Sequence, residues 1–216
     1  MNTALLLIDL QNDFCPGGAL AVTEGDRVIA VANQAINACL QQQIAVIASQ
    51  DWHPADHRSF AINSNAVPGT IGDLNGLPQV WWPVHCVQHT PGADWHPQLQ
   101  QEAITATFRK GQDPDVDSYS AFFDNGRRSK TALDDWLQQQ GIDRLYIMGL
   151  ATDYCVKYSV LDALSLGYQT TVISDGCRGV NLQPQDSQQA FDVMSKAGAD
   201  LQTLAQFVAE INPTRG

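Results

Sequence analysis

The chain has 216 residues, of which 44% are hydrophobic, and its formal net charge is −11 at pH 7. This length and composition predict one folded domain with a core of useful size and argue against intrinsic disorder. The acidic balance argues against nucleic acid and against an anionic membrane surface as partners, because both require clustered Lys and Arg. A small neutral ligand remains compatible with this charge.

Export and disulfide formation are not expected from the sequence. The N-terminal apolar run at 4–8 is short, follows no basic residue and ends at Asp9, unlike a signal peptide. No apolar run approaches the ~20 residues of a transmembrane helix. Five irregularly spaced cysteines predict reduced thiols and a cytoplasmic protein. The composition is compatible with a monomer and with a homodimer.

Short apolar runs alternate with stretches whose apolar residues recur every three or four positions, which predicts strands alternating with amphipathic helices. Residues 50–100 are instead rich in Pro, Gly, Trp and His and show no sustained period, which is typical of a functional loop. In chain order we predict strands at 5–8, 44–48, 104–108, 145–148 and 170–174 and a last short strand, with helices at 28–40, 133–140, 154–166, 185–197 and 205–211.

This order of elements predicts an α/β fold in which a mostly parallel sheet is covered by helices on both faces. We expect a single domain over residues 1–216, with an insertion at about 50–100. Because ligands of such sheets bind beyond the carboxyl ends of the strands, polar residues at those ends are the candidates for chemistry.

Four polar clusters follow predicted strands, and one of them contains Cys155. This cysteine lies where the segment that begins at Gly149 opens a helix. Free N–H groups at a helix start favour a thiolate and can bind an oxyanion. An isolated Cys is more often a buried packing residue, but this position favours a nucleophile. We assign Cys39 to a helix core and Cys15, Cys86 and Cys177 to packing in loops.

Asp9 and Lys110 follow two other strands. A carboxylate at the end of a buried strand is desolvated, so we expect a raised pKa unless a cation lies close to it. Lys110 is the candidate cation, and with Cys155 the two residues would form a Cys–Asp–Lys set. The alternatives are a hydrogen-bonding carboxylate in a turn and a solvated lysine.

Metal ligands are the third kind of candidate. Asp51 and His53 are two positions apart and project to one side of an extended chain, and His57 and His85 follow in the same aperiodic stretch. A carboxylate with imidazoles suits one divalent ion of zinc, iron or manganese. Surface histidines in a polar loop are the alternative, and we assign His89 and His96 to it.

Taken together, these segments resemble bacterial nicotinamidases (pyrazinamidases), which belong to the isochorismatase-like cysteine hydrolases. The resemblance runs in order from about residue 3 to about residue 208. The motifs that carry it are Ile8-Asp9-Leu10-Gln11-Asn12-Asp13-Phe14, Asp51-Trp52-His53-Pro54, Trp82-Pro83-Val84-His85-Cys86, Phe108-Arg109-Lys110-Gly111 and Ala151-Thr152-Asp153-Tyr154-Cys155-Val156.

The resemblance implies a three-layer α/β/α fold with a six-stranded parallel sheet. It implies a cis peptide between Leu150 and Ala151, with the Ala151 and Cys155 N–H groups forming an oxyanion hole. The roles that it implies for side chains are Asp9, Lys110 and Cys155 as the catalytic triad, Asp51, His53 and His85 as metal ligands with His57 as a further candidate, and Phe14, Trp82 and Tyr119 around the substrate ring.

The activity implied by the resemblance is hydrolysis of nicotinamide to nicotinate and ammonia through a cysteine thioester, in NAD salvage, with pyrazinamide as a further substrate. Another cysteine amidase of the same fold is an alternative, but carbamoyl-amide hydrolases lack the metal loop and isochorismatases need no thiol. A non-catalytic metal-binding protein is the alternative from a different functional class.

Overall fold

A six-stranded parallel sheet forms the centre of the protein, in a computed structural model that describes residues 2–212. The strands lie in the order β5-β2-β1-β6-β7-β8, and every neighbouring pair is parallel. Their bounds are β1 Thr3–Ile8, β2 Ala45–Asp51, β5 Ala106–Lys110, β6 Arg144–Leu150, β7 Gln169–Arg178 and β8 Asp200–Gln202. The predicted α/β class and six-stranded parallel sheet are confirmed.

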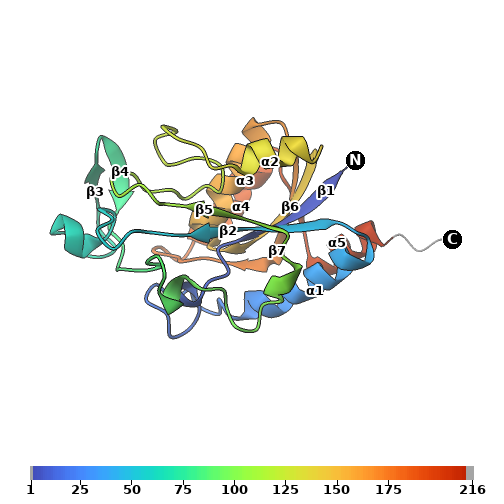
Figure 1. Cartoon of the computed structure of the whole chain (residues 1–216), viewed down its shortest axis with the longest axis horizontal. Coiled ribbons are helices and arrows are strands. Elements are labelled where there is room, and N and C mark those ends of the chain that lie inside the picture. The colour runs from blue at the N-terminus through green and yellow to red at the C-terminus, as the bar shows by residue number, and fades with distance from the viewer. Residues whose placement is uncertain (1, 213–216) are drawn as a thin grey trace.

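Helices cover both faces of the sheet and give the three layers (Figure 1). One face carries α1 (Arg27–Gln41) and α5 (Leu204–Ile211), which pack on each other, and the other face carries α2 (Leu133–Gln139), α3 (Lys157–Ser165) and α4 (Asp186–Lys196). Within residues 2–212, no helix combines the length and the apolar character needed to cross a membrane.

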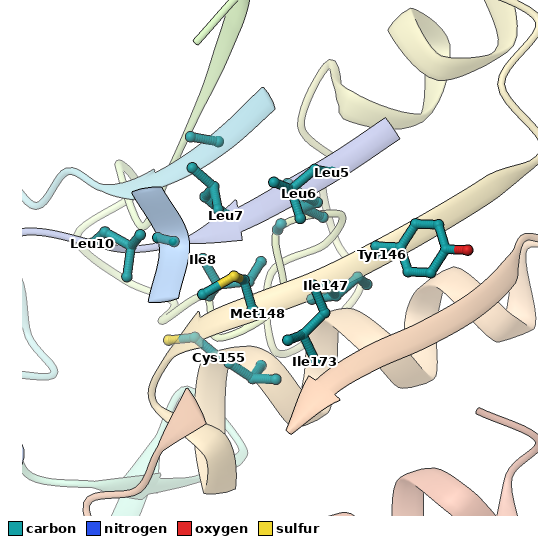
Figure 2. Packing of buried hydrophobic residues seen from close by; sticks show 14 of the residues in the cluster. Leu5, Leu6, Leu7, Ile8, Leu10, Tyr146, Ile147, Met148, Cys155 and Ile173 are labelled. Carbon is teal, nitrogen blue, oxygen red and sulfur yellow. The ribbon is translucent and has the colours of Figure 1, made fainter. Parts of the chain in front are cut away.

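The central strand β1 explains why the N-terminal run is apolar without alternation. It pairs with β2 on one side and β6 on the other, and Leu5, Leu6, Leu7 and Ile8 are all fully buried. Figure 2 shows these side chains beside residues of β6 and β7, with Cys155 at the edge of the same cluster. The hydrophobic core therefore extends to the carboxyl end of the parallel strands.

Three parts of the chain differ from the sequence prediction. The stretch 50–100 is not wholly irregular, because β3 (Ile71–Leu74) and β4 (Leu77–Val80) form an antiparallel hairpin. The predicted helix 154–166 is preceded by a π-helical turn, η5 (Thr152–Val156), so Cys155 lies inside that turn. Cys177 lies in β7 rather than in a loop, because β7 runs on to pair Cys177 with Gly149 after a register shift.

Short 3-10 turns complete the chain: η1 Asn12–Phe14, η2 Ala61–Ser64, η3 Pro91–Ala93 and η4 Gln101–Ala103. All five cysteines are free and buried, and Cys39 packs in the core face of α1 as predicted.

Candidate active site and metal centre

Four adjacent strands deliver the candidate residues to one edge of the sheet. In the order β5-β2-β1-β6, Lys110 ends the first strand, Asp51 ends the second, Asp9 follows the third and Cys155 lies just beyond the fourth. All four side chains are buried. Parallel strands bring their carboxyl ends together, so residues up to 146 positions apart in the sequence share one site.

Lys110 is the centre of this cluster. Its Nζ atom lies 2.9 Å from Asp9 Oδ2 and donates to Asp51 Oδ1 at 2.6 Å and to Cys155 Sγ at 3.4 Å. It also donates to the carbonyl oxygen of Ser118 at 2.9 Å. Burial lowers the pKa of Lys110, but Asp51 and Asp9 raise it well above its usual value. The ammonium therefore stays charged inside the protein.

Asp9 has the surroundings of a general base. The residue adopts a left-handed conformation, φ 48°, directly after β1, and its Oδ1 atom accepts a hydrogen bond of 2.7 Å from Ser49 Oγ. Oδ2 is in ion-pair contact with Lys110 but accepts no well-aligned hydrogen bond within residues 2–212. Burial raises the pKa of Asp9 and Lys110 opposes this. The carboxylate keeps a free acceptor and an increased affinity for a proton.

The surroundings of Cys155 favour the protonated thiol over the thiolate. Burial raises its pKa well above the usual value, Lys110 opposes the shift, and Asp9 adds to it. The helix start alone therefore does not produce the thiolate that the sequence suggested, and proton transfer to a neighbouring base is required. The Leu150–Ala151 peptide is cis, in agreement with the resemblance.

Asp51, His53 and His85 are all buried and offer one ligand atom each within 4.8 Å of one another. The Nδ1 atoms of His53 and His85 lie 2.8 Å from the carbonyl oxygens of Gly111 and Pro83. If each Nδ1 carries the proton, both Nε2 lone pairs face Asp51 Oδ2, at 3.3 and 3.5 Å. Three acceptors that converge in this way fit a cation, and the mixture of one carboxylate and two imidazoles suits zinc, iron or manganese.

His57 is adjacent to this centre but is held differently. Its ring centroid lies 4.4 Å from that of His53, and its Nδ1 accepts a hydrogen bond from the Ser59 backbone at 3.1 Å. Its Nε2 atom is buried without a partner within residues 2–212. Burial is the main cause, and the neighbouring His53 the second, of a pKa for His57 that is lowered to about 4. The ring is therefore neutral at pH 7. His57, His53 and Asp117 form a second group of candidate ligands.

A cavity of about 20 Å³ lies over Cys155, with Phe14, Trp82 and Tyr119 among its walls. Trp82 donates a hydrogen bond to the Tyr119 hydroxyl at 3.3 Å and meets Tyr154 edge-on, with ring centroids 4.9 Å apart. This volume holds about one water, which is less than the volume of an aromatic ring. A larger groove of about 1040 Å³ along β5 is lined by none of the candidate triad residues or candidate metal ligands.

The sequence did not single out several side chains that shape the site. Asp117 and Tyr154 line the cavity, and Asp153 accepts the Val180 and Asn181 backbone N–H groups at 2.9 and 2.8 Å. The sequence around Asp117 does not distinguish it as a cavity residue, because exposed acidic residues precede it at alternate positions. Asp153 and Tyr154 lie inside the Thr-Asp-Tyr-Cys turn, so attention to the neighbours of Cys155 would have found them.

The profile of the isochorismatase domain matches residues 3–206. The chain belongs to the isochorismatase family. It is 65% identical to the nicotinamidase of Escherichia coli K12 over 204 residues, which are 94% of this chain and 96% of that protein.

Solved structures agree in fold. A nicotinamidase/pyrazinamidase of Acinetobacter baumanii superposes with a TM-score of 0.90 at 38% identity, covering 95% of this chain and 98% of that one. The pyrazinamidase of Pyrococcus horikoshii, solved in complex with zinc, gives a TM-score of 0.78 at 34% identity and covers 94% and 99%.

Proposed function

We propose that this chain is a metal-dependent amidase that hydrolyses nicotinamide to nicotinate and ammonia, in NAD salvage, and that it also accepts pyrazinamide. The observation that carries the proposal is the contact of Lys110 with Asp9, Asp51 and Cys155, which joins a buried thiol, a base and a candidate metal centre. The chain is 65% identical to a nicotinamidase over 94% of its length, and this similarity supports the choice of substrate.

In the proposed mechanism, Asp9 removes the proton of Cys155 as the sulfur attacks the carboxamide carbon. The N–H groups of Ala151 and Cys155 hold the oxyanion, and the loss of one such donor typically costs about 10²–10³ in rate. Asp9 then gives its proton to the departing nitrogen, and ammonia leaves a thioester. Water attacks the thioester, and Asp9 takes a proton from that water and returns it to the departing sulfur, which restores the thiol. Nicotinic acid leaves and loses its proton to solvent as nicotinate.

Lys110 keeps the transfer electrostatically feasible, because a thiolate beside a bare carboxylate would be unfavourable. Asp51, His53 and His85 would hold the divalent ion, with His57 beside them. Such an ion would attract the pyridine nitrogen and thereby orient the ring. Phe14, Trp82 and Tyr119 enclose the ring in this proposal.

We further propose that residues 1–216 act as one hydrolase domain, with the stretch 50–100 as its metal-binding insertion, and that the protein works in the cytoplasm. A core cluster that runs from Ala4 to Phe207, beside one small cluster within the insertion, supports the first proposal, and five free cysteines support the second. A single chain contains every residue of the proposed site, so a monomer and a homodimer are both compatible with the mechanism.

Ammonia release from nicotinamide by the metal-loaded protein tests the function. Cys155→Ala should abolish release and leave the fold intact, as circular dichroism would show. Intact-mass and peptide analysis should place an electrophilic aldehyde analogue on Cys155, and attachment at Cys15 or Cys86 would mean that the nucleophile is misassigned. A protein that binds metal but releases no ammonia would favour the non-catalytic alternative.

A further inference from the structure

Asp117 is a buried acidic residue in the wall of the cavity over Cys155 that the mechanism above does not use. It is 3% exposed. Its Oδ1 atom accepts a hydrogen bond of 2.8 Å from the Ser118 backbone, and its Oδ2 atom accepts one of 2.9 Å from Gln79 Nε2. In the part of the chain that the structure describes, no lysine or arginine forms an ion pair with it.

The contacts of Asp117 hold its charge in place without neutralising it. Both donors are neutral amides, and the buried Gln79 side chain is itself fixed by a second hydrogen bond, to the Val80 carbonyl. Burying a carboxylate without a counter-charge costs free energy. Its presence in this wall is therefore explained either by a cation that binds nearby or by a role in function. The group of candidate ligands formed with His53 and His57 places Asp117 next to the metal centre.

Among the charged groups of the candidate triad, the candidate metal centre and the cavity wall, the charges balance only when Asp117 is included. The carboxylates of Asp9, Asp51 and Asp117 would supply three negative charges, and Lys110 with a divalent ion would supply three positive ones. Without Asp117, the same site would carry one net positive charge. A neutral site suits a neutral carboxamide, whereas a positive site would retain the carboxylate that the reaction produces.

We propose that Asp117 is a specificity residue that makes the site discriminate against its own anionic product. The inference rests on the proposed function, because it requires an amide substrate and a carboxylate product that share one ring. The charge of Asp117 repels the carboxylate and leaves the affinity for the amide largely unaffected. Like charges brought together in a buried site are strongly unfavourable, so we expect Asp117 to weaken nicotinate binding at least about tenfold relative to nicotinamide, which corresponds to about 1.4 kcal/mol.

Binding can be measured without turnover in the metal-loaded Cys155→Ala protein by isothermal titration with nicotinamide and with nicotinate. Adding Asp117→Asn should tighten nicotinate at least about tenfold relative to nicotinamide. The matched control is Asp115→Asn, which removes the same charge from an exposed carboxylate that pairs with Arg58, and it should leave the ratio unchanged. Metal content is measured in each protein, so that a change in loading is not mistaken for a change in selectivity.

The outcomes separate a charge effect from a structural one. If Asp117 only fixes Gln79 and the adjoining hairpin, Asp117→Asn weakens both ligands alike, and the proposal is overturned. Asp117→Glu keeps the charge and should keep the discrimination. If Asp117→Asn cannot be purified, equal affinity of the Cys155→Ala protein for nicotinate and nicotinamide overturns the proposal by itself. Failure to bind either ligand would refute the proposed function, whereas nicotinamide binding with an unchanged ratio refutes only the role of Asp117.

Discussion

Gly111 is predicted to be essential for metal binding, although it offers no ligand atom. It follows β5 with φ +68°, and a Cβ atom added to it would lie 2.4 Å from His53 Cε1 and 2.6 Å from His53 Nδ1. Carbon atoms pack at about 3.5–4.0 Å, so Gly111→Ala must displace the imidazole ring by roughly 1 Å. The His53 Nδ1 contact with the Gly111 carbonyl would be lost with it. Disrupting such a partner of a ligand typically costs about 10–100-fold in metal affinity.

Gly69→Ala is the matched control for this prediction. Gly69 also has a positive φ, +82°, but nothing lies within 4 Å of its added Cβ. Both variants carry the conformational penalty of about 1–2 kcal/mol in unfolding free energy, whereas only Gly111→Ala should lose metal affinity and kcat/KM. Competition with a fluorescent zinc chelator measures the affinity, and urea unfolding measures the stability. Metal affinity equal in the two variants would refute the argument.

Three further predictions concern catalysis, substrate choice and stability. Asp9→Asn and Lys110→Ala should each reduce kcat by several orders of magnitude, and the double variant should be little worse, because residues that act as one unit are non-additive; additive losses would assign them to different steps. Benzamide lacks the ring nitrogen, so its kcat/KM should be up to about 10⁴-fold lower than that of nicotinamide, and chelation should remove this preference with most of the rate; comparable hydrolysis by the loaded enzyme would make the metal structural. Asp124→Asn should lower the unfolding free energy by about 1–3 kcal/mol at pH 7, since Asp124 accepts hydrogen bonds from Gly126, Arg128 and Ser129. Burial raises the pKa of Asp124, but these hydrogen bonds lower it below its ordinary 3.8. The loss of unfolding free energy in Asp124→Asn should therefore be complete above pH 3.8 and shrink below it. A loss that does not change with pH in urea unfolding would contradict this.

The parts of the fold that depend on local patterns could be predicted from the sequence. Strand β1 was found because it is a short continuous apolar run, and helix α1 because its apolar residues recur every three or four positions. The candidate catalytic residues were found because they follow such strands. The hairpin of β3 and β4 was missed although Asn75-Gly76 is a recognised two-residue turn. Its strands contain few buried residues and one of them contains Pro78, so no alternation of apolar residues marks them.

Features that depend on spatial neighbours could not be predicted in the same way. Cys177 follows Asp175-Gly176, which looks like a turn, and only the register shift against β6 keeps it in the sheet. The ion pair of Asp51 with Lys110 depends on β2 lying next to β5. The order of the strands in the sheet cannot be deduced from the residues of either strand. Asp117 likewise gains its importance from Gln79 and the cavity, which come from distant parts of the chain.

The candidate metal centre and Cys155 form one electrostatic unit, because Lys110 contacts both Asp51 and Cys155. One oxygen of this carboxylate accepts the hydrogen bond of Lys110, and the other faces the imidazoles of His53 and His85. Burial raises the pKa of Asp51, but Lys110 and His53 lower it well below its usual value, so the carboxylate stays ionised between them. An ion held by Asp51 would weaken the attraction between this carboxylate and Lys110, and the lysine would then stabilise a thiolate at Cys155 more strongly. Removal of the metal should therefore impair formation of the thiolate as well as orientation of the ring, and the two effects separate when the rate of alkylation of Cys155 is compared with and without metal in the absence of substrate.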